Sequence, residues 1–425
     1  MRRFFSLLIA LSFAFPAAAQ VVRVKVEDTI QPISAEYISR GIDYAAQQHA
    51  QAVLIELYTP GGLVDSTREI VAKILSSPVP VIIYVTPAGA NAASAGFYIL
   101  ESADIAAMAP GTNTGSAHPV GYNTKDDVMK AKIENDLAAF LRSYAGKRNR
   151  NLTVGETVVR ESKSFTDQEA LKEKLIDIVA KNEQDLLAQV NGRTVTRFDG
   201  NTTVMKTANA PIADFDESLK ERILGFMMNP NITFLIFIIG ALSLYAEFNH
   251  PGAIIPGVLG TIFVLLAVFA MGFLPIRFAA VTLILASFAF FVLEAKFATH
   301  GILGIGGIAL LTLGGLLLVD GPIPELRVKF LTAIAVAIPF GVITVFLMTI
   351  ALRARRNKVT TGVQGMIGQL GLTRSALSPS GQVVVQGEIW TAQSSTPIPA
   401  GEPVTVRAVD GLTLLVEPVH QPALK

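Results

Sequence analysis

Residues 78–110 read PVPVIIYVTPAGANAASAGFYILESADIAAMAP and carry the clearest structural signal in the chain. Two short apolar runs, 78–85 and 104–110, are typical of strands that are buried on both faces of a sheet. Between them lies a stretch of small residues containing one serine, Ser94, and then AGFYILESA, which reads as a helix. This order predicts a βαβ unit with parallel strands.

The residues before this stretch continue the same pattern. Residues 35–50 have helical spacing, and 52–57 form another continuous apolar run that ends in TPGG (59–62). A second helical pattern covers 65–76. Since strands alternate with helices, we expect an α/β domain with a parallel sheet over residues 20–215.

The composition predicts a membrane protein. The chain has 425 residues, of which 51% are hydrophobic and 16% charged, and its mean hydropathy is +0.48. From residue 223 onwards the apolar runs approach the 20 or so residues that span a bilayer core. We therefore expect a membrane domain over 223–355 with about five helices. The predicted spans are 232–248, 253–274, 278–293, 301–319 and 330–352.

Net charge and cysteine content exclude several classes of function. A net charge of +1 gives no electrostatic reason to expect nucleic acid as a partner. The absence of cysteine excludes disulfides, thiol nucleophiles and zinc–thiolate sites.

The N-terminus has the three parts of a secretory signal over residues 1–19. Arg2 and Arg3 precede an apolar run at 4–15, and three alanines precede Gln20. The alternative is an uncleaved anchor helix, for which the run is short. With a cleaved signal, the α/β domain starts outside the cytoplasm.

Charge at the end of the membrane region bears on topology. The basic cluster RARRNK (353–358) follows the last apolar segment, and the positive-inside rule favours the cytoplasm for it. Five spans satisfy this rule, whereas four would leave the cluster outside. The tail, 359–425, contains short β-rich runs separated by glycine and proline, which predicts a small β-barrel.

Two loops of the α/β domain could carry chemistry. Both TPGG and the Ser94 loop follow strands, and such loops meet at the ligand-binding edge of a parallel sheet. Gly61 and Gly62 let backbone amides approach a ligand, and amides at the start of the helix after Ser94 favour negative charge. A serine between two sources of amides suits acyl transfer. The alternative is an ordinary turn with Ser94 as an N-cap.

A nucleophilic serine needs a base. His118 is one candidate. Residues 124–151 read as a helix with an apolar face, and Lys132 lies at the edge of that face, where loss of water favours a neutral amine. Lys125 and Lys130 look more solvated. The alternative is that Lys132 buries only its aliphatic stem.

Several segments, taken in order, resemble the NfeD family of membrane-bound serine proteases with a ClpP-class domain. The family motifs are TPGGLVDSTREIV, the segment 81–110, TGSAHPV (114–120), and the segments 132–151, 164–180, 246–260, 301–318, 381–393 and 401–418. The resemblance covers nearly the whole mature chain. One departure is Lys174, where the family usually has glycine; we expect a changed turn before Ile176.

The resemblance implies roles for individual residues. Ser94 matches the nucleophile and Lys132 the general base of a Ser–Lys dyad. The backbone N–H groups of Gly62 and Ala95 match the oxyanion hole. Lys130 and His118 remain alternatives for the base, and a dyad of this kind needs no cofactor or metal.

The resemblance also implies architecture and function. The expected parts are a ClpP/crotonase-like α/β domain outside the cytoplasm, a multi-span helical domain, and an OB-fold at 359–425. The implied protein is a homo-oligomeric membrane-bound endopeptidase. Together with the signal pattern and the basic cluster, this predicts an inner-membrane protein with its protease domain in the periplasm and its C-terminus in the cytoplasm. It would cleave hydrophobic segments of stomatin-like membrane proteins.

Two other functions fit less well. The chain could be a non-proteolytic scaffold or adaptor for stomatin-like proteins, although a scaffold would not need Ser94, Lys132 and the paired glycines together. Acyl-CoA chemistry occurs on the same superfamily fold, but a secretory signal argues against a cytoplasmic CoA substrate.

Overall fold

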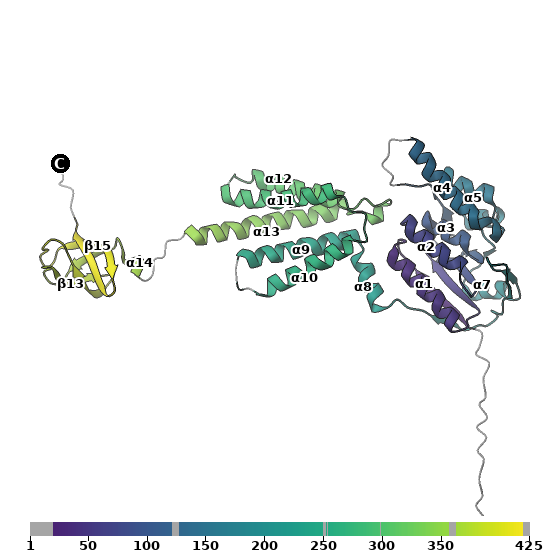
Figure 1. Cartoon of the computed structure of the whole chain (residues 1–425), viewed down its shortest axis with the longest axis horizontal. Helices are drawn as coiled ribbons and strands as arrows, with labels where there is room; N and C mark the ends of the chain where they lie inside the picture. Colours follow the sequence, from purple (N-terminus) through teal and green to yellow (C-terminus); the bar gives the residue numbers. More distant parts are fainter. Residues whose placement is uncertain are drawn as a thin grey trace, which may run out of the picture. The chain divides into compact units, whose positions relative to one another are not determined.

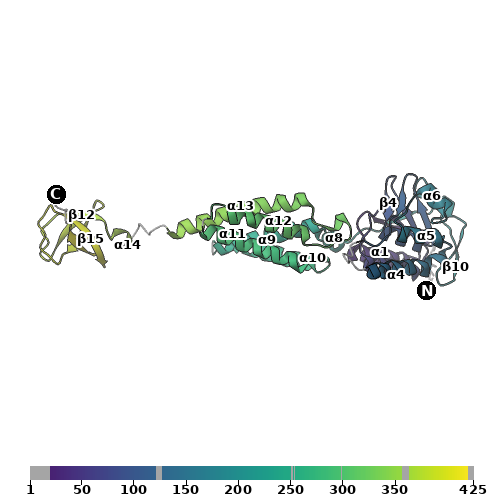
Figure 2. The same ribbon diagram turned by 90° about the horizontal axis from the view of Figure 1, so that it is seen from above.

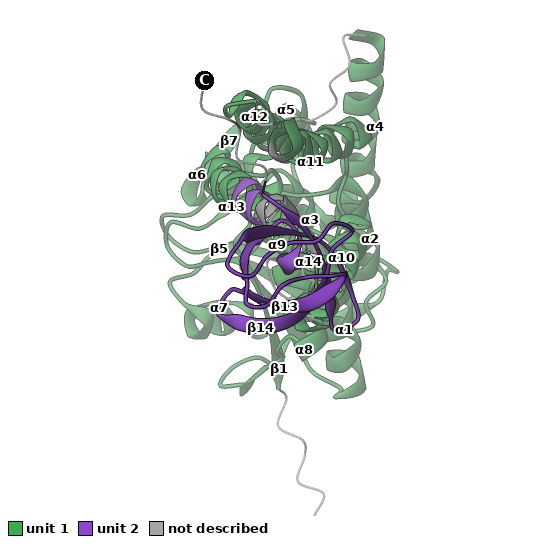
Figure 3. Cartoon of the chain, turned by 90° about the vertical axis from the view of Figure 1, so that its left-hand side faces the viewer, with its two compact units in different colours: residues 1–344 green, residues 345–425 purple. Residues whose placement is uncertain are grey.

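The structure is a computed structural model that describes residues 20–120, 127–249, 252, 254–297, 299–356 and 363–419. The predicted signal peptide, 1–19, and Lys125 lie outside these residues. The chain divides into two compact units, 1–344 and 345–425 (Figure 3). The first holds the α/β domain and most of the apolar helices, and the second holds the C-terminal barrel.

A parallel sheet forms the centre of the α/β domain, as predicted. The strand order is β11-β1-β2-β3-β5-β8, and every neighbouring pair is parallel. Its strands are β1 (Val21–Val26), β2 (Ala52–Leu57), β3 (Val81–Val85), β5 (Ile105–Met108), β8 (Ile178–Val179) and β11 (Ile212–Asp214). All residues of β2, β3 and β5 are buried, because helices cover both faces of the sheet.

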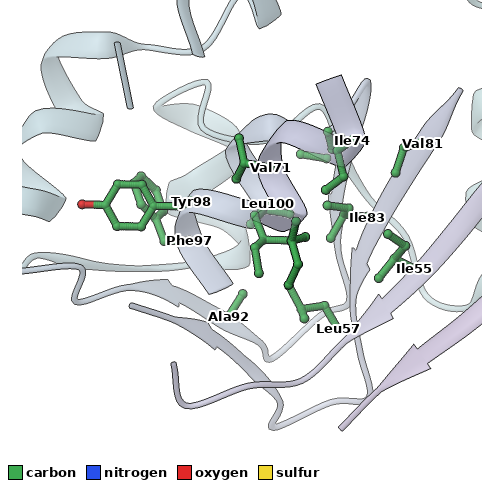
Figure 4. Packing of buried hydrophobic residues seen from close by; sticks show 14 of the residues in the cluster. Ile55, Leu57, Val71, Ile74, Val81, Ile83, Ala92, Phe97, Tyr98 and Leu100 are labelled. Atoms are coloured by element: carbon green, nitrogen blue, oxygen red, sulfur yellow. The ribbon is translucent and has the colours of Figure 1, made fainter. Parts of the chain in front are cut away.

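Helices divide between the two faces of the sheet (Figure 1). α1 (Pro32–Gln47), α2 (Val64–Leu75) and α3 (Ala95–Ser102) bury side chains in one core, and α7 (Glu183–Val190) buries its leucines in another on the opposite face. Figure 4 shows where α2, α3 and the sheet meet, through Val71, Ile74, Phe97, Leu100, Ile55, Leu57 and Ile83.

A small second sheet positions the loop that carries Ser94. β4 (Asn91–Ala93) pairs parallel with β6 (Asn113–Gly115), which pairs antiparallel with β7 (Ser164–Thr166). The remaining elements of the domain are α5 (Leu152–Arg160), α6 (Asp167–Lys172), β9 (Thr194–Thr196) and β10 (Thr202–Val204).

The predicted helix over 124–151 is too long at its C-terminal end. α4 covers Asp127–Ala145, a single 3-10 turn covers Gly146–Arg148, and Asn149 takes a left-handed φ of 59°. The chain turns inward here because Arg148 and Arg150 are buried. Arg148 pairs with Asp104 and donates to the carbonyl of Ser102 at 3.1 Å.

Lys174, which stands where the family usually has glycine, lies in a turn whose backbone conformation favours glycine. Lys174 follows α6 with a left-handed φ of 59°. Ile176 behind it is buried in the core. The substitution therefore places a side chain on a strained backbone without displacing Ile176.

All five predicted apolar segments are helical. They are α9 (Pro230–Asn249), α10 (Ile254–Met271), α11 (Phe278–Phe297), α12 (Ile302–Leu317) and α13 (Phe330–Arg356). α8 (Leu219–Met227) connects them to the α/β domain and packs on α1, where Arg40 pairs with the buried Glu221. α9 packs against α10 and α11 packs against α12, and each of these pairs lies side by side in Figure 1 and Figure 2.

Three helical stretches are long and apolar enough to cross a membrane: Pro230–Phe248, Ile254–Met271 and Pro324–Leu347. Two apolar helices are shorter, Phe278–Glu294 and Ile302–Leu317. The second of these covers only about 24 Å at 1.5 Å per residue, against a bilayer core of about 30 Å. Its packing against α11 makes the two a compact hairpin.

The second unit contains the predicted barrel. Five strands close in the order β12-β13-β14-β16-β15 around a core that includes Val383, Val404 and Leu414. The strands are β12 (Leu370–Thr373), β13 (Ser380–Val385), β14 (Glu388–Gln393), β15 (Pro403–Asp410) and β16 (Thr413–Pro418), preceded by α14 (Val363–Met366). A closed barrel of five strands is consistent with an OB-fold.

Candidate active site

Ser94 lies in a strained turn between β4 and α3. Its φ is 52° and its ψ is −110°, a conformation that costs a non-glycine residue on the order of 1–3 kcal/mol. Its amide donates to the carbonyl of Gly115 at 2.8 Å, which ties the turn to β6. The side chain of Ser94 makes no capping hydrogen bond to α3. The interpretation of Ser94 as an ordinary N-cap is therefore wrong.

The TPGG turn packs directly against Ser94. Thr59 exchanges backbone hydrogen bonds with β4, its amide donating to Asn91 at 2.8 Å and its carbonyl accepting from Ala93 at 3.0 Å. Gly61 has a φ of +126°, and a Cβ on it would lie 2.8 Å from the Cβ of Ser94. Only glycine fits here, because both the backbone angle and the space exclude a side chain.

Two backbone amides beside Ser94 have no hydrogen-bond acceptor among the described residues. Gly62 is held against Ile30, whose carbonyl accepts from Leu63 at 2.8 Å, and Ala95 is the first residue of α3. Among the described residues, neither the amide of Gly62 nor that of Ala95 donates a hydrogen bond. Such amides are available to a ligand oxygen that gains negative charge.

These groups open into a cleft of about 570 Å³. Gly62, Ser94 and Ala95 line it together with Tyr98 and His118. The volume lies within the usual range for sites that enclose a small ligand or a short peptide segment. The sequence prediction that the two loops converge is confirmed.

A second set of lining residues comes from outside the α/β domain. The loops after α10 and α12 contribute Gly272, Phe273, Leu274, Pro275, Asp320, Pro322 and Ile323. Sequence analysis did not predict this contact, because the two loops are distant from Ser94 along the chain and carry no catalytic motif.

Lys132 does not line the cleft. It lies in the first half of α4, where most side chains, including Lys132 and Lys130, are exposed. The cleft begins further along the same helix, at Leu137 and Phe140. The structure therefore brings together the predicted nucleophile and oxyanion-hole amides but leaves the predicted base outside their cleft.

His118, the alternative base, does line the cleft. Its ring Nδ1 lies 3.0 Å from the carbonyl oxygen of Val159. If that nitrogen carries the proton, the imidazole is held as a donor to the carbonyl and its Nε2 is left as an acceptor.

α3 is supported by buried charges that sequence analysis did not single out. Every residue of α3 is buried. Burial raises the pKa of Glu101, near the C-terminal end of α3, to about 8. Arg150 contacts the carbonyl of Ala103 at 3.4 Å and pairs with Asp177 at 2.7 Å.

In the part of the chain that the structure describes, no three histidine or acidic side chains are grouped to hold a metal ion.

Three domain families and two curated relatives match this chain. Residues 20–213 match the N-terminal domain of NfeD1b, 231–350 the NfeD integral membrane domain, and 363–418 the NfeD-like C-terminal, partner-binding domain. Membrane-bound protease PH1510 of Pyrococcus horikoshii is 34% identical and covers 98% of both chains. Membrane protein NfeD1b of Bacillus subtilis is 28% identical over 90% of this chain and 89% of its own.

Solved structures resemble parts of the chain. The 1510-N membrane protease specific for a stomatin homolog, from Pyrococcus horikoshii, is 33% identical, with 49% of this chain and 98% of that chain covered and a TM-score of 0.43. A second structure is a lysine-to-alanine mutant of the 1510-N membrane-bound stomatin-specific protease in complex with a substrate peptide. It is 32% identical, the match covers 49% of this chain and 98% of that chain, and the TM-score is 0.46.

Replacing Gly61 tests the geometry of the turn beside Ser94. In Gly61→Ala the new methyl group would displace Ser94, and a shift of about 1 Å is expected to reduce kcat/KM about 100-fold. The measurement is hydrolysis of an apolar peptide by the full chain in detergent. Gly192→Ala is the matched control, because Gly192 also has a positive φ, +79°, but has open space around it. Equal activity of the two variants would contradict this geometry.

Proposed function

The chain belongs to the NfeD family, and we propose that it is a membrane-bound serine endopeptidase that uses Ser94 as its nucleophile. Family membership agrees with the predicted organisation, a ClpP-like α/β domain followed by a helical membrane region and a C-terminal barrel. One observation carries the proposal: Ser94 lies in a cleft between two amides, those of Gly62 and Ala95, that have no acceptor among the described residues.

The two amides suit the oxyanion of a tetrahedral intermediate. They belong to different elements, the TPGG turn and α3, so they approach a carbonyl oxygen from two directions. In acyl-transfer enzymes one such donor contributes roughly 3–4 kcal/mol to catalysis.

Lys132 is proposed as the base. Its neutral amine accepts the proton of the Ser94 hydroxyl while Oγ attacks the peptide carbonyl carbon. The C–N bond then breaks, the ammonium of Lys132 protonates the leaving amine, and water hydrolyses the ester on Ser94. Because Lys132 is exposed in this structure, the step requires the first turns of α4 to approach the cleft when a peptide is bound.

The proposed substrate is a hydrophobic segment of a stomatin-like membrane protein. Solved structures of the 1510-N protease are described as specific for stomatin or a stomatin homolog, and the C-terminal domain of this chain matches a partner-binding domain. We further propose a homo-oligomer, as the ClpP-like resemblance implies. The alternative function, a non-proteolytic scaffold for stomatin-like proteins, would use the same C-terminal domain but not the cleft.

Topology follows from the number of helices that cross the membrane. We propose an inner-membrane protein with a cleaved signal, a periplasmic protease domain, five spans and a cytoplasmic C-terminal domain. A reporter fused after Lys358 should then report the cytoplasm. A signal from outside the cytoplasm would show that an even number of helices cross, and the short α11 or α12 would be the helix to reconsider.

Three alanine variants of the full chain test the mechanism with an apolar peptide. Ser94→Ala should reduce cleavage to the uncatalysed background, and Lys132→Ala should lower kcat on the order of 10³-fold or more, as loss of a paired base does. His118→Ala should retain activity within about ten-fold.

Lys130→Ala is the matched control for Lys132→Ala. Lys130 lies on the same exposed part of α4 and carries the same charge, 3.9 Å from Asp127, so the variant should remain active. If His118→Ala is inactive and Lys132→Ala active, His118 is the base instead. Full activity of Ser94→Ala would contradict the proposed protease mechanism altogether.

A further inference from the structure

The second wall of the cleft belongs to the membrane region. We define the membrane-side wall as Gly272, Phe273, Leu274, Pro275, Asp320, Pro322 and Ile323, all of which line the cleft that contains Ser94. Residues 272–275 follow α10 and residues 320–323 follow α12. This wall therefore stands at the ends of apolar helices, where the chain leaves the membrane region.

The membrane-side wall is tied together across both loops. Ile276 and Val319 form an antiparallel bridge. The amide of Asp320 donates to the carbonyl of Pro275 at 2.8 Å, and the amide of Arg277 donates to that of Leu318 at 3.0 Å. These bonds join two loops that are more than forty residues apart in sequence. The two loops therefore form one connected surface.

Charge within the wall is neutralised. Asp320 pairs with Arg277 at 2.6 Å between Oδ1 and Nη2. The other side chains of the wall are apolar or proline, and Phe273 is 40% exposed while Leu274 and Ile323 are buried. Phe273, whose ring packs edge-on against Phe269, is therefore the large apolar side chain of this wall with the most surface left for a ligand.

We propose that the membrane-side wall is part of the substrate site and that Phe273 selects apolar residues of an extended peptide held between the two walls. This inference rests on the proposed protease function and adds a specificity determinant outside the α/β domain. It assigns the occupant as an extended apolar peptide segment, because the wall is continuous with the cleft of Ser94 and presents an apolar, charge-neutral surface. A segment that lies at the membrane surface reaches this wall and Ser94 together.

Site-specific crosslinking tests the proposal. Because the chain has no native cysteine, an introduced thiol is the only thiol that can react. The full chain carries Ser94→Ala, so that bound peptide is not cleaved, and is embedded in phospholipid nanodiscs. Single variants place a thiol at Phe273 on the membrane-side wall, at Val120 on the α/β side of the cleft, or at Phe278, which is exposed at the start of α11 but does not line the cleft. The probe is an extended apolar peptide with a terminal bromoacetyl group, and iodoacetamide normalises thiol reactivity.

We expect the peptide to alkylate Phe273→Cys and Val120→Cys at least ten-fold faster than Phe278→Cys after normalisation. Unlabelled peptide should suppress both reactions. Labelling of Val120→Cys without Phe273→Cys would overturn this proposal and leave the protease function standing. If neither Phe273→Cys nor Val120→Cys is labelled, no peptide enters the cleft, and both this proposal and the proposed protease function are overturned.

A kinetic comparison separates specificity from catalysis. With Ser94 intact, Phe273→Ala should lower kcat/KM for the apolar peptide by about ten-fold or more, chiefly through KM, as loss of a hydrophobic contact in a pocket does. Hydrolysis of a small acetyl ester, which does not reach the wall, should be unchanged. Phe278→Ala is the matched control and should behave as wild type. An equal loss on peptide and ester would contradict a role in substrate selection.

Discussion

The backbone of Ser94 is held in a strained conformation, and the candidate site depends on that constraint. A φ of 52° persists because the residues around it are fixed from three sides: β4 is paired with β6, Thr59 is bonded to both ends of β4, and α3 is buried along its whole length. Packing of the domain core offsets the free-energy cost of this strained backbone. The carbonyl of Ser94 still accepts from the amide of Phe97 at 3.0 Å, but its side chain makes no capping bond and lines the cleft.

The same constraint explains why the turn before α2 contains two glycines. Gly61 leaves room for Ser94, and Gly62 leaves room for Ile30, so the turn can pass between them. The amides of Gly62 and Ala95 then end in one cleft although they are more than thirty residues apart in sequence. Behind α3, Arg148 and Arg150 bind the carbonyls of Ser102 and Ala103, which anchors the far end of the helix.

Much of this could be predicted from local sequence pattern. Continuous apolar runs located the strands 52–57 and 81–85, and the position of TPGG and Ser94 after strands placed them at one edge of the sheet. Two features were not predictable in this way. The exposure of Lys132 depends on how far α4 extends beyond its contact with α3, and the membrane-side wall depends on a bridge between Ile276 and Val319. Both are tertiary contacts that periodicity does not report.

The central claim is that Ser94 is an activated nucleophile in this cleft. The most direct test treats the full chain in detergent with an alkyl fluorophosphonate, which phosphonylates activated serine hydroxyls, and maps the adduct by peptide mass spectrometry. Ser66 also lines the cleft, so Ser66→Ala is the matched control for Ser94→Ala. We expect one adduct, on Ser94, that persists in Ser66→Ala and is lost in Ser94→Ala. No adduct, or an adduct on another serine, would contradict it.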